Sequence, residues 1–258
     1  MKYSLTERLD FKYLSQAEEI IVEYRNRRGI PDLAQKYPNA TIILQFIPSQ
    51  IEKDINWNEI EEYNILCEED FICCVSSYTD AKTCKNKNIK FYFGYPIESF
   101  FELRKVKELG ACYARLGPEL FFDLPAVAKV GVPVRLTPNV SSYLYLSGPC
   151  GQWVRPEDLY LYEPYVSVIE FEDANPEKEA AFYRIYTKDG WSGDLNALFT
   201  NFDAHGVIGR LIPAEVIAAR LKCRHRCQRT GDCRLCEFAF KFADKDRLKE
   251  YAENHNLI

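Results

Sequence analysis

The amino-acid sequence predicts an α/β fold: a TIM-like β/α barrel, closed or nearly closed, followed by a cysteine-rich and mostly helical C-terminal extension. Three observations support this prediction. Seven short apolar segments recur along the first two thirds of the chain, and segments with helix start and stop signals separate them. The Gly-x-Gly-x-x-Gly turn of an open dinucleotide-binding sheet is absent. An open doubly wound sheet is the alternative arrangement of the same units.

The predicted strands are short, nearly continuous in hydrophobicity and rich in Ile, Val, Phe and Tyr. This pattern is typical of parallel strands that are covered on both faces. In chain order, the predicted strands are Glu19–Tyr24, Thr41–Ile47, Phe71–Ser76, Ile89–Tyr95, Ala111–Leu116, Val132–Leu136 and Val166–Phe171.

Helix signals lie between these strands. Asn56 is a candidate cap for a helix over Trp57–Leu66. Two further helices end at a glycine, which is a common stop signal, and two begin with a proline, which suits a first helical turn. These four helices are Glu98–Leu109 before Gly110, Phe121–Val130 before Gly131, Pro156–Leu161 and Pro176–Ile185. We expect residues 1–205 to form the barrel and residues 206–258 to form the extension.

Composition limits the class of protein. The chain has 258 residues, 47% of them hydrophobic and 28% charged, which is ordinary for a globular protein. Its net charge of −5 argues against a protein that coats nucleic acid over its whole surface. The N-terminus lacks a signal-peptide core, and no apolar run is long enough to cross a membrane. Ten cysteines without a secretory signal then predict a reducing, cytoplasmic location.

Four of these cysteines crowd into one short stretch. They have the spacing Cys-x3-Cys-x5-Cys-x2-Cys and are Cys223, Cys227, Cys233 and Cys236. Thiolates at such spacing can converge on one metal centre, either Zn2+ or a [4Fe–4S] cluster, and the spacing leaves this choice open. Two short disulfides or four buried thiols are the alternatives. Six Lys or Arg residues and one Asp lie between Arg220 and Cys236, so this basic segment could contact RNA or an anionic small molecule.

A barrel enzyme carries its chemistry at the C-terminal ends of the strands. Glu170 ends a predicted strand at that edge and is the candidate general acid/base. Arg115 and Arg135 are the candidate catalytic anion clamps, because a guanidinium matches carboxylate or phosphate geometry. Three further residues are candidates for substrate binding: Tyr95, Asn139 and Arg155. The alternative is that the Arg and Glu side chains only close the top of the barrel.

One stretch resembles a known family. It runs Trp153-Val-Arg-Pro-Glu-Asp and enters a helix, and the next strand ends in an acidic residue. The segment 153–172 is similar to the second half of the barrel in peptidase family U32, the collagenase-like family, whose members include partners in RNA-base and ubiquinone hydroxylation. A looser βα match covers residues 90–172. The resemblance implies a barrel, and it leans toward an iron–sulfur cluster.

The resemblance has departures. Members of that family usually continue the strand into a Lys-x-Glu-Gly-Arg-like turn, whereas this chain has Ile169-Glu-Phe-Glu-Asp173. Carried over residue by residue, the resemblance implies that Glu170 is the acidic strand end and that Cys150 is one possible cluster ligand. Proteolysis is not supported, because the sequence has no zincin His-Glu-x-x-His motif and no nucleophile that spacing can assign.

Together these observations predict an intracellular, U32-like barrel protein with a four-cysteine metal centre. We expect an enzyme, or an enzyme subunit, that modifies RNA or a small anionic substrate. The alternative is a non-enzymatic binding or assembly protein whose zinc site is structural.

Overall fold

The computed structural model describes residues 1–47, 55–68, 70–117, 120, 123–137, 154, 156–171, 175–187 and 218. The chain divides into two units. The first comprises Met1–Leu120, Ala126–Thr137 and Tyr165–Ala180, and the second comprises Phe121–Pro125, Pro138–Pro164 and Ala181–Ile258. All the strands described below belong to the first unit.

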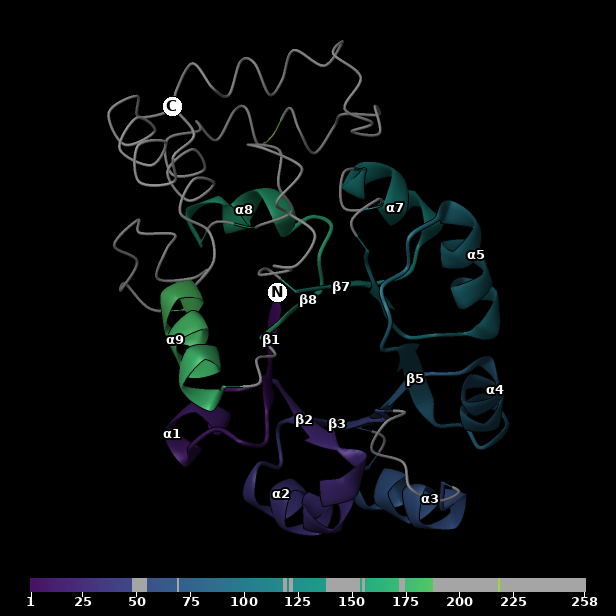
Figure 1. Ribbon diagram of the computed structural model, residues 1–258, viewed down its shortest axis with the longest axis vertical. Helices are drawn as coiled ribbons and strands as arrows, with labels where there is room; N and C mark the ends of the chain where they lie inside the picture. Colours follow the sequence, from purple (N-terminus) through teal and green to yellow (C-terminus); the bar gives the residue numbers. More distant parts are fainter. Residues whose placement is uncertain are drawn as a thin grey trace, which may run out of the picture. The chain divides into compact units, whose positions relative to one another are not determined.

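Eight parallel strands form one sheet that curls into a nearly closed barrel, as the ring of strands in Figure 1 shows. The order around the sheet is β5-β4-β3-β2-β1-β8-β7-β6. Two parallel bridges, Tyr92–Tyr113 and Ile97–Leu116, connect the β5 edge with the β6 edge. The strands are β1 (Lys2–Thr6), β2 (Glu19–Glu23), β3 (Thr41–Gln45), β4 (Phe71–Val75), β5 (Lys90–Phe93), β6 (Ala114–Arg115), β7 (Val134–Leu136) and β8 (Val168–Glu170).

The barrel prediction is therefore confirmed, and the open doubly wound sheet was the wrong alternative because the two edges of this sheet meet. The seven predicted strands all form, with shorter bounds. The sequence analysis missed β1, where Ser4 and Thr6 alternate with Tyr3 and Leu5. Both Ser4 and Thr6 are buried. Because this strand has polar residues at buried positions, it lacks the continuous apolar run by which the other strands were recognised.

Alternation along each strand sorts the side chains into an inner and an outer set. Ile21, Ile43 and Ile72 are paired with one another across β2, β3 and β4. Together with Cys74 and Tyr92 they form a buried cluster. This apolar side of the interior is the usual filling of a β/α barrel, in which branched side chains dominate.

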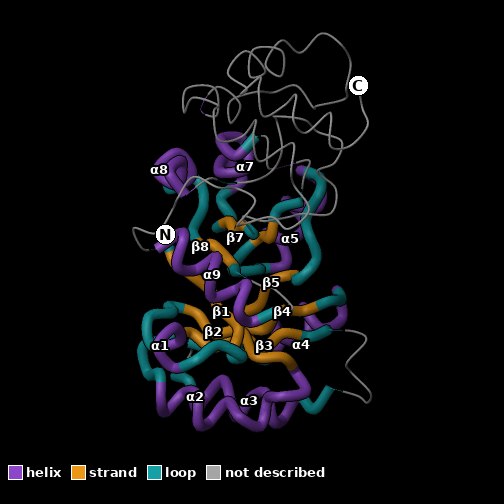
Figure 2. Tube along the Cα trace, turned by 60° about the vertical axis from the view of Figure 1, so that its left-hand side comes forward, coloured by secondary structure: helices purple, strands orange, loops and turns teal. Residues whose placement is uncertain are grey.

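The helices are α1 (Phe11–Leu14), α2 (Ile30–Lys36), α3 (Trp57–Leu66), α4 (Tyr78–Asn86), α5 (Phe100–Leu109), α7 (Leu124–Val130), α8 (Leu159–Tyr162) and α9 (Pro176–Thr187), with 3-10 turns η1 (Tyr24–Gly29) and η5 (Pro156–Asp158). In the first unit, α2, α3, α4 and α5 lie outside the ring of strands (Figure 1), and Figure 2 shows α2 and α3 side by side next to β2 and β3. The sequence analysis missed α1, α2, α4 and η1. It predicted one helix over Pro156–Leu161, where the structure has η5 followed by α8.

Local signals account for the helix ends. The Asn56 side chain accepts a hydrogen bond from the Glu59 amide, so the predicted cap of α3 is confirmed. The α5 helix begins two residues later than predicted, because Ser99 caps it by accepting from the Glu102 amide. Gly110 follows α5 with a φ of 90°, a left-handed conformation that glycine adopts without steric cost.

The predicted C-terminal extension lies outside the described residues, apart from position 218, and its boundary at residue 206 stays a prediction. Among the helices that the structure describes, none combines the length and apolar character needed to cross a bilayer.

Candidate functional site

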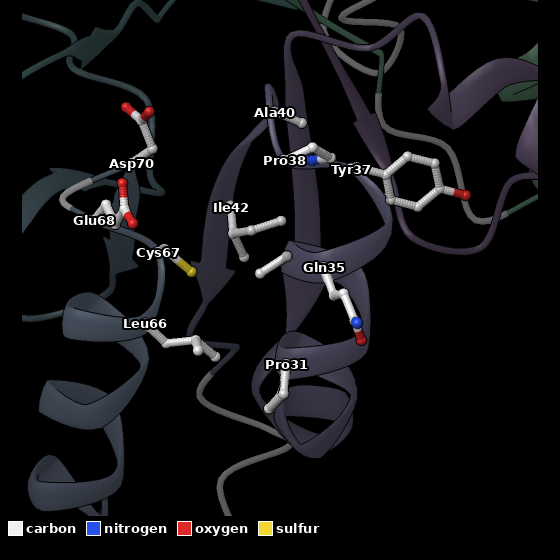
Figure 3. Close-up of a pocket in the computed structure, with 11 residues that line it drawn as sticks. Pro31, Gln35, Tyr37, Pro38, Ala40, Ile42, Leu66, Cys67, Glu68 and Asp70 are labelled. Atoms are coloured by element: carbon white, nitrogen blue, oxygen red, sulfur yellow. The ribbon is translucent and has the colours of Figure 1, made fainter.

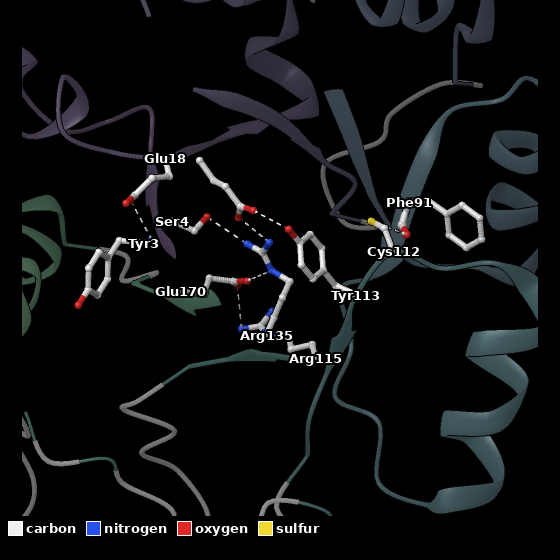
Figure 4. Close-up of polar contacts among 10 residues, drawn as sticks. Tyr3, Ser4, Glu18, Phe91, Cys112, Tyr113, Arg115, Arg135 and Glu170 are labelled. Atoms are coloured by element: carbon white, nitrogen blue, oxygen red, sulfur yellow. Dashed lines mark hydrogen bonds and ion pairs between the residues drawn. The ribbon is translucent and has the colours of Figure 1, made fainter. Parts of the chain in front are cut away.

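Arg135 is the centre of a buried polar network inside the barrel (Figure 4). Its Nε donates to Glu170 Oε2 at 2.9 Å, one terminal nitrogen donates to Glu19 Oε2 at 2.6 Å, and the other donates to Ser4 Oγ at 3.0 Å. The side chains of Arg135 and Glu19 are 0% exposed, and that of Glu170 is 1% exposed. The arginine therefore joins two buried carboxylates from strands that flank β1.

Two tyrosine rings pack against the Arg135 guanidinium. Their centroids lie 4.5 Å away for Tyr92 and 5.1 Å away for Tyr113. The Tyr113 hydroxyl also donates to Glu19 Oε1 at 3.2 Å. Burial alone would lower the pKa of Arg135, but Tyr92, Glu170 and Glu19 together raise it well above its ordinary value. The guanidinium is thus held charged in the interior.

Arg115 connects this network to the C-terminal edge of the strands. Its guanidinium donates to the Gly94 carbonyl at 3.0 Å and to Thr137 Oγ1 at 3.3 Å, and these residues directly follow β5 and β7. One terminal nitrogen lies 3.6 Å from Glu170 Oε1. The Arg115 side chain is 22% exposed. Among the described residues, a chain of charges therefore leads inward from the part-exposed Arg115 through Glu170 and Arg135 to Glu19.

The predicted catalytic residues therefore lie together. Glu170, Arg115 and Arg135 form one contiguous set, as expected for strand ends that meet at one edge of a barrel. Whether they are catalytic or only close the barrel stays a prediction. Arg135 is fully buried and bonded to two carboxylates, so it can orient Glu170, whereas Arg115 is part-exposed.

Tyr95, a predicted substrate-binding residue, contacts Phe93 and Tyr78. Its ring lies 5.1 Å from the Phe93 ring. Burial, and next a hydrogen bond with Tyr78, raise the pKa of Tyr95 above its ordinary value. None of the contacts recorded for Tyr95 in the described part of the chain reaches Arg115 or Glu170. The other two predicted substrate-binding residues, Asn139 and Arg155, lie outside the described residues.

The four predicted metal ligands also lie outside the described residues, as does Cys150. The structure therefore does not test them. Within the ranges that the structure describes, no three His, Cys, Asp or Glu side chains come together in a way that could hold a metal ion.

Sequence reasoning missed Glu19, Ser4 and Tyr113 as members of the network. A signal was available for Glu19, because a carboxylate opens a strand that continues Ile20-Ile-Val22 and would have to be buried with a partner. Ser4 gave no signal, since β1 itself was not recognised. Tyr113 was inside a predicted strand, but nothing in the sequence indicated that its hydroxyl would meet a residue 94 positions earlier.

A separate pocket of about 300 Å³ lies away from this network, between α2 and the end of α3 (Figure 3). Its lining includes Tyr37, Leu66 and Cys67. Burial, and next the charge of Asp70, raise the pKa of Cys67 to about 11. A thiol in this state is protonated at neutral pH, so the pocket does not present a reactive thiolate.

Comparison with known proteins identifies no family. No protein-family model matches the chain, and no curated protein matches it, so the resemblance to peptidase family U32 receives no support there. Among solved structures, the chain is similar to a 3-keto-L-gulonate-6-phosphate decarboxylase from Vibrio cholerae, with 12% identity, a TM-score of 0.44, and 71% of this chain and 95% of that chain covered.

It is also similar to a phosphoribosyl anthranilate isomerase from Thermus thermophilus, with 12% identity, a TM-score of 0.43, and 78% of this chain and 97% of that one covered. Both neighbours are named as enzymes. Likeness at this level says nothing about the reaction of this chain, and the barrel is established here by the strand pairing itself.

Proposed function

We propose that this chain is a β/α-barrel enzyme that acts on a small anionic substrate. In this proposal Arg115 binds the anionic group and Glu170 gives or takes the proton. Arg135 holds Glu170 in place from below, through the bond between its Nε and Glu170 Oε2. The anionic group would enter at the C-terminal edge of the strands, where Arg115 is anchored beside Gly94 and Thr137.

The observation that carries this proposal is an ion network where a barrel normally has apolar filling. Glu19, Arg135 and Glu170 occupy interior positions with at most 1% exposure. Well-packed hydrophobic residues at such positions are often as stabilising as a buried ion set, or more so. Stability alone is therefore a weak reason for the network. Places where a sequence departs from the rule for its fold are most often functional sites.

Sulfate binding at neutral pH tests the anion site, because sulfate is fully ionised there. Isothermal titration of the full chain with sulfate should show binding in the wild type and at least about a tenfold weaker affinity in Arg115→Gln. Arg104→Gln is the matched control, since Arg104 is an exposed arginine on the outer helix α5. We expect it to bind sulfate like the wild type.

Equal sulfate affinity in Arg115→Gln and wild type would contradict the proposal. If the site is confirmed, small phosphorylated and carboxylated compounds that compete with sulfate become the candidate substrates. Turnover of a competing compound, followed by NMR, should be lost in Glu170→Gln.

We further propose that Cys223, Cys227, Cys233 and Cys236 bind one metal centre, iron–sulfur or zinc, and that the basic segment around them contacts RNA or the anionic substrate. The spacing of the thiols and their cationic neighbours support this. If the metal centre is an iron–sulfur cluster, we propose a U32-like redox or hydroxylation role. If the metal is zinc, we propose that the site is structural and that the chain is a binding protein.

Elemental analysis and an absorption spectrum of anaerobically purified protein distinguish these forms. Iron and sulfide with absorbance near ~400 nm, lost in Cys223→Ser, would indicate a cluster. About one zinc per chain, lost in the same variant, would indicate a zinc site. Equal metal content in wild type and variant would contradict the site.

A further inference from the structure

The pocket between α2 and the end of α3 has room for a small ligand (Figure 3). It lies within the first unit, beside the residues that precede β3 and β4, so it is at the opposite end of the strands from Arg115. Its volume of about 300 Å³ is at the lower end of the range for small-molecule sites. A cavity of about half this size already holds benzene. The pocket therefore accommodates a compact organic molecule.

The inner part of its lining is apolar. Ile42 on β3 and Ala40 just before it are 1% and 8% exposed, and Figure 3 shows Ile42 between the α2 side and the α3 side of the pocket. Pro31, Pro38 and Leu66 add further carbon surface, and Leu66 is 49% exposed. An apolar group of a ligand that covers this surface gains by removing it from water.

The charged part of the lining has a single sign. Glu68 and Asp70 line the pocket on the α3 side, and both residues are exposed. No ion pair joins either carboxylate to another residue in the part of the chain that the structure describes, and none of the described lining residues is a Lys, Arg or His. The Lys36 ammonium, at the end of α2, lies instead over the rings of Phe11 and Tyr37, at 5.0 Å and 5.4 Å from their centroids. The two carboxylates are therefore not neutralised within the described lining.

Two helix ends add to this negative charge. Gln35 and Tyr37 line the pocket at the C-terminal end of α2, and Leu66 and Cys67 line it at the C-terminal end of α3. The C-terminal end of a helix carries a partial negative charge, which favours cations nearby. The last turn of α3 has no basic residue of its own. Helix ends and carboxylates therefore favour a ligand of the same kind, one with a positive charge.

We propose that this pocket binds a small organic cation, an ammonium group that carries apolar substituents. The positive charge lies toward Glu68 and Asp70, and the substituents cover the apolar surface of Ala40, Ile42 and Leu66. This site goes beyond the proposed function, because it uses neither Arg115 nor Glu170.

Choline and its neutral isostere 3,3-dimethylbutan-1-ol are suitable probes, because they share one shape and differ in charge. Cys67 lines the pocket, so its alkylation by iodoacetamide reports whether the pocket is occupied. At pH 9 the raised thiol pKa of about 11 leaves a small thiolate fraction and hence a slow, measurable rate. Choline keeps its charge at this pH. The rate with and without each probe, followed by mass spectrometry on the full chain, gives the affinity of the probe at this site.

Choline should slow the alkylation of Cys67 in a saturable way, with an affinity at least about fivefold higher than that of the neutral isostere. The double variant Glu68→Gln with Asp70→Asn should bring the two affinities within about twofold of each other. Glu62→Gln is the matched control, since Glu62 is an exposed carboxylate of α3 that does not line the pocket. We expect this variant to keep the preference for choline.

Three results would overturn the proposal. Absence of protection by both probes would show that the pocket is not a site for such molecules. Equal affinities of the two probes in the wild type would remove the preference for a cation. Loss of that preference in Glu62→Gln, to the same extent as in the double variant, would assign it to the overall charge of the chain. If the double variant does not fold, salt decides: the preference of the wild type should shrink between about 0.05 and 0.5 M NaCl, and an unchanged preference would overturn the role of the carboxylates. None of these results bears on the anion site at Arg115.

Discussion

Replacing Arg135 by methionine should strongly destabilise the barrel at neutral pH. Methionine matches the length of the arginine stem but offers no donor. The change removes the bonds to Glu170 at 2.9 Å, to Glu19 at 2.6 Å and to Ser4 at 3.0 Å. It leaves two carboxylates in the interior with exposures of 0% and 1% and without their shared cation.

The expected loss is about 3–5 kcal/mol of unfolding free energy, the usual cost when one member of a buried ion set is removed. The loss should depend on pH with a definite sign. A buried carboxylate without a cation binds a proton more readily when folded than when unfolded. Its contribution is therefore most unfavourable at high pH and disappears as the pH falls, so the loss should be smaller at pH 5 than at pH 7.

Urea unfolding of the full chain, followed by circular dichroism at both pH values, measures this difference. The control is a triple variant, Arg135→Met with Glu19→Gln and Glu170→Gln, in which no buried charge of the set remains unpaired. We expect it to recover more than half of the loss, because replacing a whole buried ion set costs far less than breaking it. A loss below about 1 kcal/mol, or an equal loss at pH 7 and pH 5, would refute the reasoning.

Two further predictions concern other parts of the chain. The rate at which iodoacetamide alkylates Cys67, followed by mass spectrometry as a function of pH, should be half-maximal near the raised thiol pKa of about 11. Asp70→Asn should move this midpoint to lower pH, because the Asp70 carboxylate raises the thiol pKa. A midpoint at the ordinary thiol pKa in the wild type would contradict this prediction. Glu179 accepts from the Thr6 amide at 2.6 Å and from its hydroxyl at 2.7 Å, so Glu179→Gln should cost about 1.5–3 kcal/mol in urea unfolding, whereas exposed Glu177→Gln should cost less than about 0.5 kcal/mol. Equal effects of these two substitutions would show that the buried contact to β1 contributes little.

The elements that sequence reasoning recognised are those whose cause is local. Asn56 caps α3 through an amide three residues away, and Gly110 ends α5 through its own φ of 90°. Apolar runs such as the one at Ile42 marked the strands covered on both faces. The β1 strand escaped because its inward positions, Ser4 and Thr6, meet polar partners that lie far along the chain.

Sequence reasoning also placed Glu170, Arg115 and Arg135 at one edge of the barrel, because the ends of parallel strands meet there whatever their separation in the chain. It did not predict their partners. Glu19 lies 116 residues from Arg135, and Tyr113 lies 94 residues from Glu19. No spacing rule connects such positions.

The sequence by itself thus determined seven of the eight strands, the cap of α3, the glycine end of α5 and the class of fold, since periodicity, capping and glycine conformation act within a few residues. Only the tertiary structure decided that the sheet meets its own edge, that a serine-bearing strand completes it, and which charges face each other inside. Those outcomes depend on register around a ring of eight strands, where β1 brings Glu19 and Glu170 to the two sides of Ser4. The resulting order of charges leaves Arg135 enclosed between two carboxylates and Arg115 part-exposed beside Glu170.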